Sequence, residues 1–215
     1  LGEYSALMFA ESITFEDAIE MTHLRGKLMQ NSEEGKMMAI LGLDSKTIDK
    51  ACSQINESHK TAYVASANYN SAKQTVIAGN IEGIDIARNL LPDIGAKRCI
   101  ELNVSIASHT NLMTDAANEF NEALQKINLS PPRHPIIQNY TGEIETDISS
   151  IKQNLFNQLT KPVLWTKTMD KISQSASCLI EVGPKNILCG LSKGYDLSSI
   201  LYIADQNFKD KVQNI

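Results

Sequence analysis

The sequence has no excess of positive charge, no long apolar run and no closely spaced pair of cysteines. Its 215 residues carry a formal net charge of -5, so neither nucleic acid nor an anionic membrane surface is favoured as a partner. No apolar stretch approaches the roughly 20 residues of a membrane-spanning helix, and no signal peptide is visible. The four cysteines lack the C-x-x-C spacing of zinc sites and redox pairs, which indicates ordinary thiols in a reducing, cytoplasmic compartment.

The order of strand-like and helix-like segments predicts an α/β protein with two lobes. With 42% hydrophobic residues, the chain can bury one sizeable core and a smaller second one. Residues 35–103 show the order strand, helix, strand, strand, helix, strand, with breaks at Gly42, residues 70–73 and Gly79. This βαββαβ order is typical of a ferredoxin-like unit, and we expect it to form an inserted small lobe.

The remaining residues, 1–34 and 104–215, are expected to form the larger lobe. Two helices are predicted near 2–12 and 14–30, the second capped by Thr14 with Asp17 three residues later. Beyond residue 104, helices alternate with short apolar strands, and this alternation is typical of an α/β lobe with a parallel sheet. No internal repeat or low-complexity tract is found.

The first residues, Leu1-Gly2-Glu3-Tyr4, match the end of a nucleophile elbow. In the G-x-S-x-G elbow, a serine lies on a sharp turn between a strand and a helix, with its hydroxyl exposed. Leu1-Gly2 fits the last two positions and Tyr4 onward fits the helix, so the serine would lie immediately before Leu1. The pattern indicates acyl chemistry. We expect residues 1–215 alone, without that serine and the strands before it, to be poorly folded and inactive.

Arg25 is the most unusual charge, because its helix places it among apolar side chains. A buried guanidinium needs a partner, since an unpaired charge in a low dielectric is costly. Two partners remain open from position alone: an internal Asp or Glu in a structural ion pair, or a ligand carboxylate held by two parallel hydrogen bonds. At about 100° per residue, the apolar face around Arg25 comprises Phe15, Ala18, Ile19, Met21, Leu24, Leu28 and Met29.

His109 is the strongest candidate for a general base. It follows Ser108 between the last strand of the small lobe and a helix, a position where α/β proteins gather catalytic groups. A structural histidine or a helix cap is the alternative. No histidine has metal-ligand spacing with another His or Cys, and three lack a comparable placement: His23, His59 and His134.

Gln158 and Asn70 are weaker candidates. Gln158 lies near a helix end ahead of Pro162, where a surface amide is the simplest interpretation. Asn68 and Asn70 flank Tyr69 at a strand end, where asparagine is common because it tolerates a left-handed backbone and bonds its own main chain. Residue type alone assigns neither Gln158 nor Asn70 a role.

Taken together, several segments resemble the malonyl-CoA:acyl carrier protein transacylases, acyltransferases of type II fatty acid synthesis that are related to polyketide synthase acyltransferase domains. The resemblance covers almost the whole chain, and the order of the segments is more specific than any one of them. The segments are residues 1–7, which resemble the stretch after the family's Gly-His-Ser, then Arg25-Gly26, 68–71 with 74–79, 95–98, Val104-Ser105 with Ser108-His109, Gln158-Leu159 with 162–166, and 181–184.

The resemblance implies a hydrolase-like α/β lobe with an inserted ferredoxin-like lobe, and a ping-pong acyl transfer. A serine before Leu1 would attack the malonyl thioester, and the phosphopantetheine thiol of acyl carrier protein would then take the malonyl group. His109 would be the base, oriented by the main-chain carbonyl of Gln158. Arg25 would bind the malonate carboxylate, the Leu1 amide would serve the oxyanion hole, and Asn70 would lie at the cleft between the lobes. No metal or organic cofactor is implied, because coenzyme A enters as part of the substrate.

Two departures from the family pattern lie near the expected cleft. Ile106-Ala107 replaces the Val-Pro that often precedes Ser-His in bacterial members, and Lys185 stands where glycine is frequent. Neither removes a chemical group. Two other hypotheses stay open: a polyketide synthase-type acyltransferase, and a truncated, non-catalytic scaffold that binds acyl carrier protein. A plain hydrolase is disfavoured, since Arg25 would then have no reason to face inward.

Overall fold

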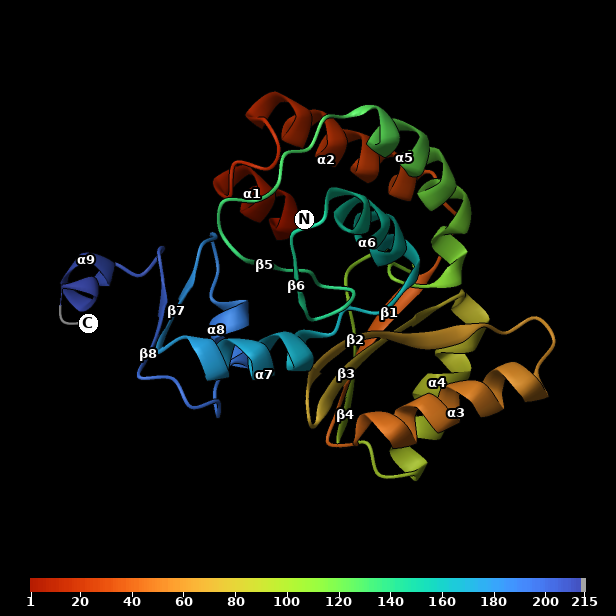
Figure 1. Ribbon diagram of the computed structural model, residues 1–215. Coiled ribbons are helices and arrows are strands. Elements are labelled where there is room, and N and C mark those ends of the chain that lie inside the picture. Colours follow the sequence, from red (N-terminus) through yellow and green to blue (C-terminus); the bar gives the residue numbers. More distant parts are fainter. Residues whose placement is uncertain (214–215) are drawn as a thin grey trace.

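The computed structural model describes residues 1–213 as an α/β protein in which a layer of helices packs beside a four-stranded sheet (Figure 1). The helical layer consists of α1 (Gly2–Phe9), α2 (Phe15–Gln30), α5 (Thr114–Lys126) and α6 (Ile148–Thr160). Their facing sides form one core. In this core Tyr4 and Phe120 meet edge to face, with ring centroids 6.5 Å apart.

Helix α2 begins where the sequence predicts. The Thr14 side-chain oxygen accepts a hydrogen bond from the Asp17 amide at 3.1 Å, which satisfies one free N–H group of the first turn. The predicted apolar face is only partly covered, because Phe15 and Ile19 are 60% and 55% exposed. α2 packs against α1 and α5, and these helices bury the side that carries Arg25.

The sheet is built from residues 36–101 in the predicted order of strands and helices. In chain order the elements are β1 (Lys36–Leu41), α3 (Ser45–Ser58), β2 (Val64–Ser71), β3 (Gln74–Gly79), α4 (Ile81–Asp93) and β4 (Arg98–Glu101). All strand pairs are antiparallel, in the order β2-β3-β1-β4. α3 and α4 cover one face over a core that includes Met38, Ile48 and Ile77. β4, the last strand of this unit, ends at Glu101, two residues before the end of the predicted range 35–103.

The parallel sheet expected of the larger lobe is much smaller than the sequence indicates. Within residues 1–213, the only parallel ladder between named strands joins β7 (Cys178–Glu181) to β8 (Ser199–Tyr202). β5 (Ile136–Ile137) instead pairs antiparallel with β6 (Ile144–Glu145). The reason is a reversal at Gly142, whose φ of +65° suits glycine. The α/β class is confirmed, whereas a hydrolase-like lobe stays a prediction.

Main-chain hydrogen bonds join the sheet to the chain segment after α6. The Tyr69 amide donates to the Val163 carbonyl, and the Val163 amide donates to the Ala67 carbonyl, both at 2.9 Å. Val163 is followed by α7 (Trp165–Ser175), α8 (Ile187–Leu191) and α9 (Phe208–Val212). The end of β2 therefore lies beside the chain that links α6 to α7. The division into lobes at 34/35 and 103/104 stays a prediction.

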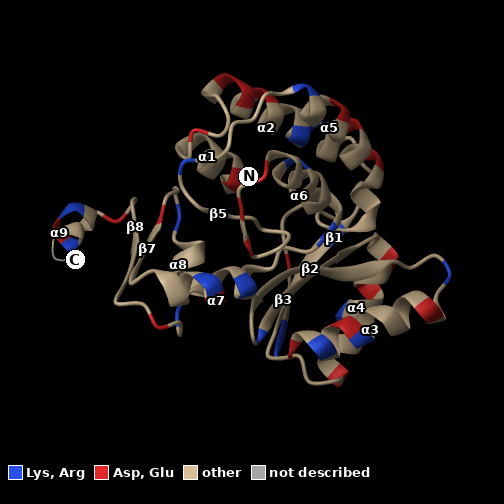
Figure 2. Ribbon diagram, viewed as in Figure 1, with Lys and Arg blue, Asp and Glu red and all other residues tan. Residues whose placement is uncertain are grey.

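Residues of both charge signs are spread along the helices, including α2, α3 and α5 (Figure 2). On α7, Lys167 and Lys171 pair with Glu143, at 3.1 Å and 2.8 Å. The four cysteines are free thiols. None of the helices within residues 1–213 has the length and apolar character to cross a lipid bilayer.

Candidate functional site

His109 is held at the turn between β4 and the 3-10 helix η1 (Asn111–Met113). Its φ of +63° lies in the left-handed region that non-glycine residues seldom adopt, which indicates a position fixed by its surroundings. Its amide donates to the Leu159 carbonyl at 3.0 Å, and its ring Nδ1 lies 2.6 Å from the Gln158 carbonyl oxygen. A carbonyl can only accept, so Nδ1 carries a proton and the Nε2 of the neutral ring keeps its lone pair.

The surroundings of His109 favour the neutral imidazole. Burial lowers its pKa to about 4; the hydrogen bond to Gln158 opposes this shift, and the positive charge of Arg25 reinforces it. A neutral ring whose Nδ1–H is already donated is the form that a general base needs near neutral pH.

Arg25 is buried on α2, with 8% of its surface exposed, and forms no ion pair with a carboxylate of the described residues 1–213. Its Nη2 donates to Gln158 Oε1 at 3.1 Å, and its Nε has no hydrogen-bond partner. None of the ion pairs found within residues 1–213 includes it. Burial lowers the pKa of the guanidinium, and Tyr4 and Glu3 oppose that shift. The direct structural ion pair that the sequence left open is therefore not formed, and an unpaired donor is left that suits a ligand carboxylate.

Gln158 connects the two groups. Its main-chain carbonyl faces His109, its side-chain oxygen faces Arg25, and only 1% of the residue is exposed. The interpretation as a surface amide is wrong. Ile151, Leu155 and Gln158 have the spacing i, i+4, i+7 and share one face of α6, so the face that buries the two apolar side chains also buries the amide.

Glu3 is a residue of this cluster that the sequence reasoning missed, together with Gln138 and Asn154. Its carboxylate accepts hydrogen bonds from Nε2 of Gln158 and from Nε2 of Gln138, the latter at 3.1 Å. Asn154 Nδ2 donates to Gln138 Oε1 at 2.7 Å. Burial raises the pKa of Glu3 against these hydrogen bonds. The available signal is helical spacing, because Glu3 and Leu7 (i, i+4) share the buried face of α1.

Leu1 lies at the start of α1, next to these groups. Its carbonyl accepts from the Tyr4 amide at 3.1 Å. The Leu1 main-chain nitrogen lies close enough to Arg25 and His109 for electrostatic interaction with both. The main chain of Leu1, the Arg25 guanidinium and the His109 imidazole therefore lie within electrostatic reach of one another.

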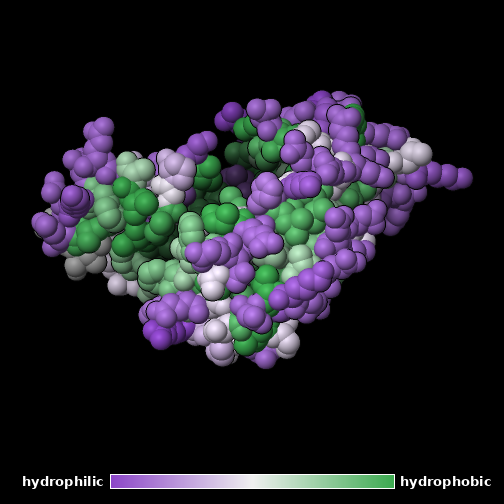
Figure 3. All heavy atoms as spheres, turned by 90° about the horizontal axis from the view of Figure 1, so that it is seen from above, coloured by the Kyte–Doolittle hydropathy of each residue, from purple (hydrophilic) through white to green (hydrophobic). Residues whose placement is uncertain are grey.

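A groove of about 650 Å³ runs beside this cluster. Gly2 and Glu3 of α1 line it, as do Asn68 and Asn70 of β2, which lie at irregular positions within the strand and not in a turn. His109 and Arg25 do not line it. Much of the remaining wall is apolar, and the space-filling view shows apolar surface gathered in a hollow of the molecule (Figure 3). Its apolar residues include Phe9, Ile136, Trp165, Ile172, Val182 and Leu188.

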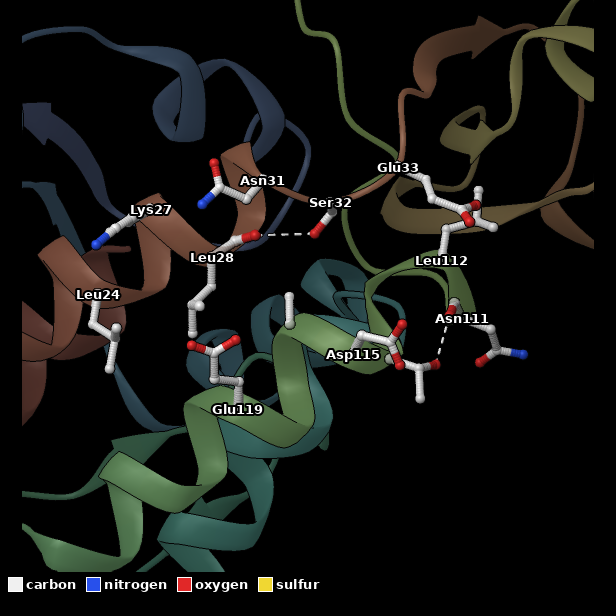
Figure 4. A pocket seen from close by; sticks show the side chains of 12 residues that line it. Leu24, Lys27, Leu28, Asn31, Ser32, Glu33, Asn111, Leu112, Asp115 and Glu119 are labelled. Atoms are coloured by element: carbon white, nitrogen blue, oxygen red, sulfur yellow. Dashed lines mark hydrogen bonds between the residues drawn. The ribbon is translucent and has the colours of Figure 1, made fainter.

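A second hollow, of about 670 Å³, lies between the end of α2 and the start of α5 (Figure 4). None of the predicted site residues lines it. Leu28 of α2 and Leu112 of η1 contribute apolar surface, whereas Lys27, Asp115 and Glu119 are exposed charges of both signs. This hollow therefore lacks the buried polar groups that position a ligand.

The cluster around Gln158 combines a neutral base, an unpaired cation and the start of a helix. The imidazole can take a proton, the guanidinium can bind a carboxylate, and main-chain N–H groups at a helix start can stabilise a negative oxygen. Within residues 1–213, no group of three His, Cys, Asp or Glu side chains is placed to hold a metal ion.

Comparison with known proteins finds relatives along nearly the whole chain. The acyl transferase domain family matches residues 1–197. The malonyl CoA-acyl carrier protein transacylases of Salmonella typhimurium and Bacillus subtilis are 43% and 36% identical over 197 residues, which is 90% of this chain. The match covers 63% and 62% of these two relatives, so the chain spans a little under two thirds of their length.

Solved structures give the same result. FabD from Acinetobacter baumannii has a TM-score of 0.94 and 37% identity, over 99% of this chain and 69% of that one. A malonyl-transacylase in complex with a type II polyketide acyl-carrier protein has a TM-score of 0.91 and 36% identity, over 99% of this chain and 70% of that one. The chain, in which His109, Arg25 and Glu3 of α1 gather around Gln158, belongs to the acyl transferase domain family.

Proposed function

We propose that the protein transfers a malonyl group from malonyl-CoA to the phosphopantetheine thiol of acyl carrier protein. The observation that carries the proposal is the buried, unpaired guanidinium of Arg25, joined through Gln158 to an oriented His109. The names of the relatives support it, since two of them are malonyl CoA-acyl carrier protein transacylases. A further relative was solved with its acyl-carrier protein.

The transfer has two half-reactions and uses a serine immediately before Leu1. In the first, His109 Nε2 takes the hydroxyl proton, the serine oxygen attacks the thioester carbonyl, and coenzyme A leaves with that proton as a thiol. In the second, Nε2 takes the proton of the carrier thiol, the sulfur attacks the serine ester, and the proton returns to the departing serine oxygen. The Gln158 carbonyl holds Nδ1–H through both steps.

Arg25 distinguishes malonyl from acetyl in this scheme. Malonyl carries a free carboxylate, which the planar guanidinium can bind with two parallel hydrogen bonds. No protein carboxylate within residues 1–213 forms an ion pair with Arg25, so none competes directly for it. The main-chain amide of Leu1, at the start of α1, supports the negative oxygen of the tetrahedral intermediate.

We place the thioester arm of the substrate in the groove that Asn70 lines, between α1 and β2. This corresponds to a cleft between a lobe of residues 35–103 and a lobe of the remaining residues, and the separate hydrophobic cores of the helical layer and the sheet support that division. The four free thiols support a cytoplasmic location. No resident metal or cofactor is part of the proposal.

The test is malonyl transfer to purified carrier protein that bears its phosphopantetheine arm, followed by mass spectrometry, with enzyme that includes the residue before Leu1. We expect that residue to be serine, the carrier to gain a malonyl group, and Ser→Ala at that position to abolish transfer. Residues 1–215, which lack that hydroxyl, should form no malonyl ester. Carrier binding without transfer would favour the scaffold hypothesis, and normal transfer by residues 1–215 alone would contradict the serine mechanism.

A further inference from the structure

We infer that Glu3 and Gln158 form a positioning pair that sets the selectivity for the acyl group. The Gln158 side chain lies between the Glu3 carboxyl group and the Arg25 guanidinium and keeps the two from direct contact. The inference rests on the proposed function, because its readout is the preference for malonyl over acetyl. It explains why a guanidinium with so little exposed surface has no direct carboxylate partner.

The side-chain amide of Gln158 has one allowed orientation. Its Nε2 donates to Glu3, and its Oε1 accepts from Arg25 Nη2 at 3.1 Å. Guanidinium nitrogens can only donate. Both carboxyl oxygens of Glu3 accept hydrogen bonds, one from Gln158 and one from Gln138. A flipped amide would place NH₂ against the guanidinium and oxygen against the carboxylate, and both contacts would repel.

Glu3 is itself anchored from the opposite side. Gln138 Nε2 donates to it at 3.1 Å and also contacts the Ile151 carbonyl at 3.4 Å, while Asn154 donates to Gln138 Oε1 at 2.7 Å. Glu3, Gln138 and Gln158 are 6%, 0% and 1% exposed. Hydrogen bonds in such a dry network are stronger than in water, and unpaired groups are costly. The network therefore fixes where the negative charge sits.

The neutral amide of Gln158 gives Arg25 a hydrogen-bond acceptor and Glu3 a hydrogen-bond donor, so that neither group needs a direct ion pair with the other. A carboxylate in contact with Arg25 would form the strong bidentate pair and would occupy the donors that a substrate carboxylate needs. With Gln158 in between, the buried Nε of the guanidinium has no hydrogen-bond partner among residues 1–213. The same residue orients His109 through its main-chain carbonyl. Gln158 of α6 therefore contacts both the residue that would select the acyl group and the residue that would act as the base.

The sharpest test exchanges the two side chains in one variant, Glu3→Gln with Gln158→Glu. Net charge and the numbers of amides and carboxylates are unchanged. The new amide at position 3 can donate to the carboxylate at position 158 and still accept from Gln138, but the carboxylate then contacts Arg25 directly. Titration calorimetry should show that the affinity for malonyl-CoA relative to acetyl-CoA falls about tenfold or more, the size of one charge-assisted hydrogen bond.

Two single variants distinguish the role of Glu3 as a hydrogen-bond acceptor for Gln158 from the role of its negative charge. Glu3→Gln still offers Gln158 an oxygen, because Gln138 and the half-buried Asn154 can rotate to match it, so the malonyl-to-acetyl ratio should stay close to wild type. Glu3→Met removes the acceptor and should lower the ratio about tenfold. Glu11→Gln is the matched control, an exposed carboxylate just beyond the same helix that pairs with Arg133. Melting curves check that each variant is folded.

An unchanged ratio in the exchange variant would overturn the inference, and so would equal losses for both acyl-CoAs in Glu3→Met. If Glu3→Met does not fold, the exchange variant, which keeps every hydrogen-bond partner, decides alone. A wild-type protein with no preference for malonyl-CoA over acetyl-CoA would instead overturn the proposed function, before any variant is compared.

Discussion

At the scale of residues, the site depends on one amide residue that serves two partners with two different atoms. The main-chain oxygen of Gln158 faces His109 and its side-chain oxygen faces Arg25. A substitution at Gln158 can change the side-chain contact with Arg25, but the main-chain carbonyl that faces His109 stays. Variants at Arg25 and His109 therefore test the two halves of the site separately.

Arg25→Ala should reduce malonyl transfer far more than acetyl transfer, because only malonyl presents a second carboxylate. Loss of a charged hydrogen bond corresponds to about 10- to 100-fold. Steady-state kinetics with malonyl-CoA and acetyl-CoA measures the ratio of kcat/KM. Arg133→Ala removes an exposed arginine that pairs with Glu11 and should leave the ratio unchanged. Equal losses with both substrates would count against the carboxylate-binding role of Arg25.

His109 should remain neutral well below pH 6. Its pKa in the folded protein is lowered from 6.5 to about 4, so the unfolded chain binds this proton more tightly. The free energy of unfolding should therefore rise with pH between about 4 and 6.5; below that window both states are protonated and above it neither is. NMR titration of the imidazole measures the pKa, and His109→Gln should remove this part of the pH dependence. A pKa of 6.5 or higher would contradict the prediction.

At the scale of elements, four short stretches bring the site together: the start of α1, the middle of α2, the end of α6 and the turn after β4. Each has a local reason for its position. α2 starts at a side-chain cap on Thr14, and α6 starts at Asp147, whose side chain accepts from the Ser150 amide at 2.8 Å. The geometry of the site should therefore respond to helix caps that are far from the chemistry.

Thr14→Ala should destabilise the protein by about 1 kcal/mol, because the first turn of α2 loses its capping acceptor. Urea unfolding measures the change. Thr22→Ala on the same helix is the control: its hydroxyl only bonds the Ala18 and Ile19 carbonyls, so its effect should stay within about 0.5 kcal/mol. Similar effects of the two variants would show that the cap does not matter.

Gly79→Ala should be strongly destabilising, whereas Gly26→Ala should stabilise. A Cβ at Gly79 would lie 2.0 Å from the Tyr63 carbonyl oxygen, a main-chain atom, while a Cβ at Gly26 meets nothing within 4 Å. We expect a cost of about 3 kcal/mol or more at position 79, and a gain of about 0.5 to 1 kcal/mol at position 26, in the interior of α2. Thermal unfolding compares the two, and a tolerated Gly79→Ala would contradict the packing at the end of β3.

The helices and the antiparallel sheet could be predicted because their signals are local. Caps, apolar periodicity and glycine breaks mark residues 36–101, and the structure has the expected element order there. The pairing of β5 with β6 could not be predicted, since neither two-residue strand has a pattern of its own. Arg25 and His109 were identified as candidates from sequence, but Glu3 was not, because its partner Gln158 lies 155 positions away and one polar residue on an apolar helix face does not reveal its partner.

At the scale of the whole molecule, the helical layer and the sheet have separate cores, and residues of α1, β2 and α7 line the groove. Main-chain bonds between β2 and Val163 hold the two parts in register. A substrate in this groove would contact both parts. His109 and Arg25 do not line the groove and are linked to it through Gln158 and the groove-lining Glu3. In the acyl transfer that we propose, only the thioester arm of each carrier would have to enter the groove.

Peptide mapping of the protein after exposure to malonyl-CoA alone, with no carrier present, tests the central claim most directly. The enzyme must include the residue before Leu1. The account predicts a malonyl ester on a serine at that position, absent when His109 is replaced by alanine and strongly reduced when Arg25 is. A malonyl group on any other residue, or an ester that forms equally well without His109, would contradict it.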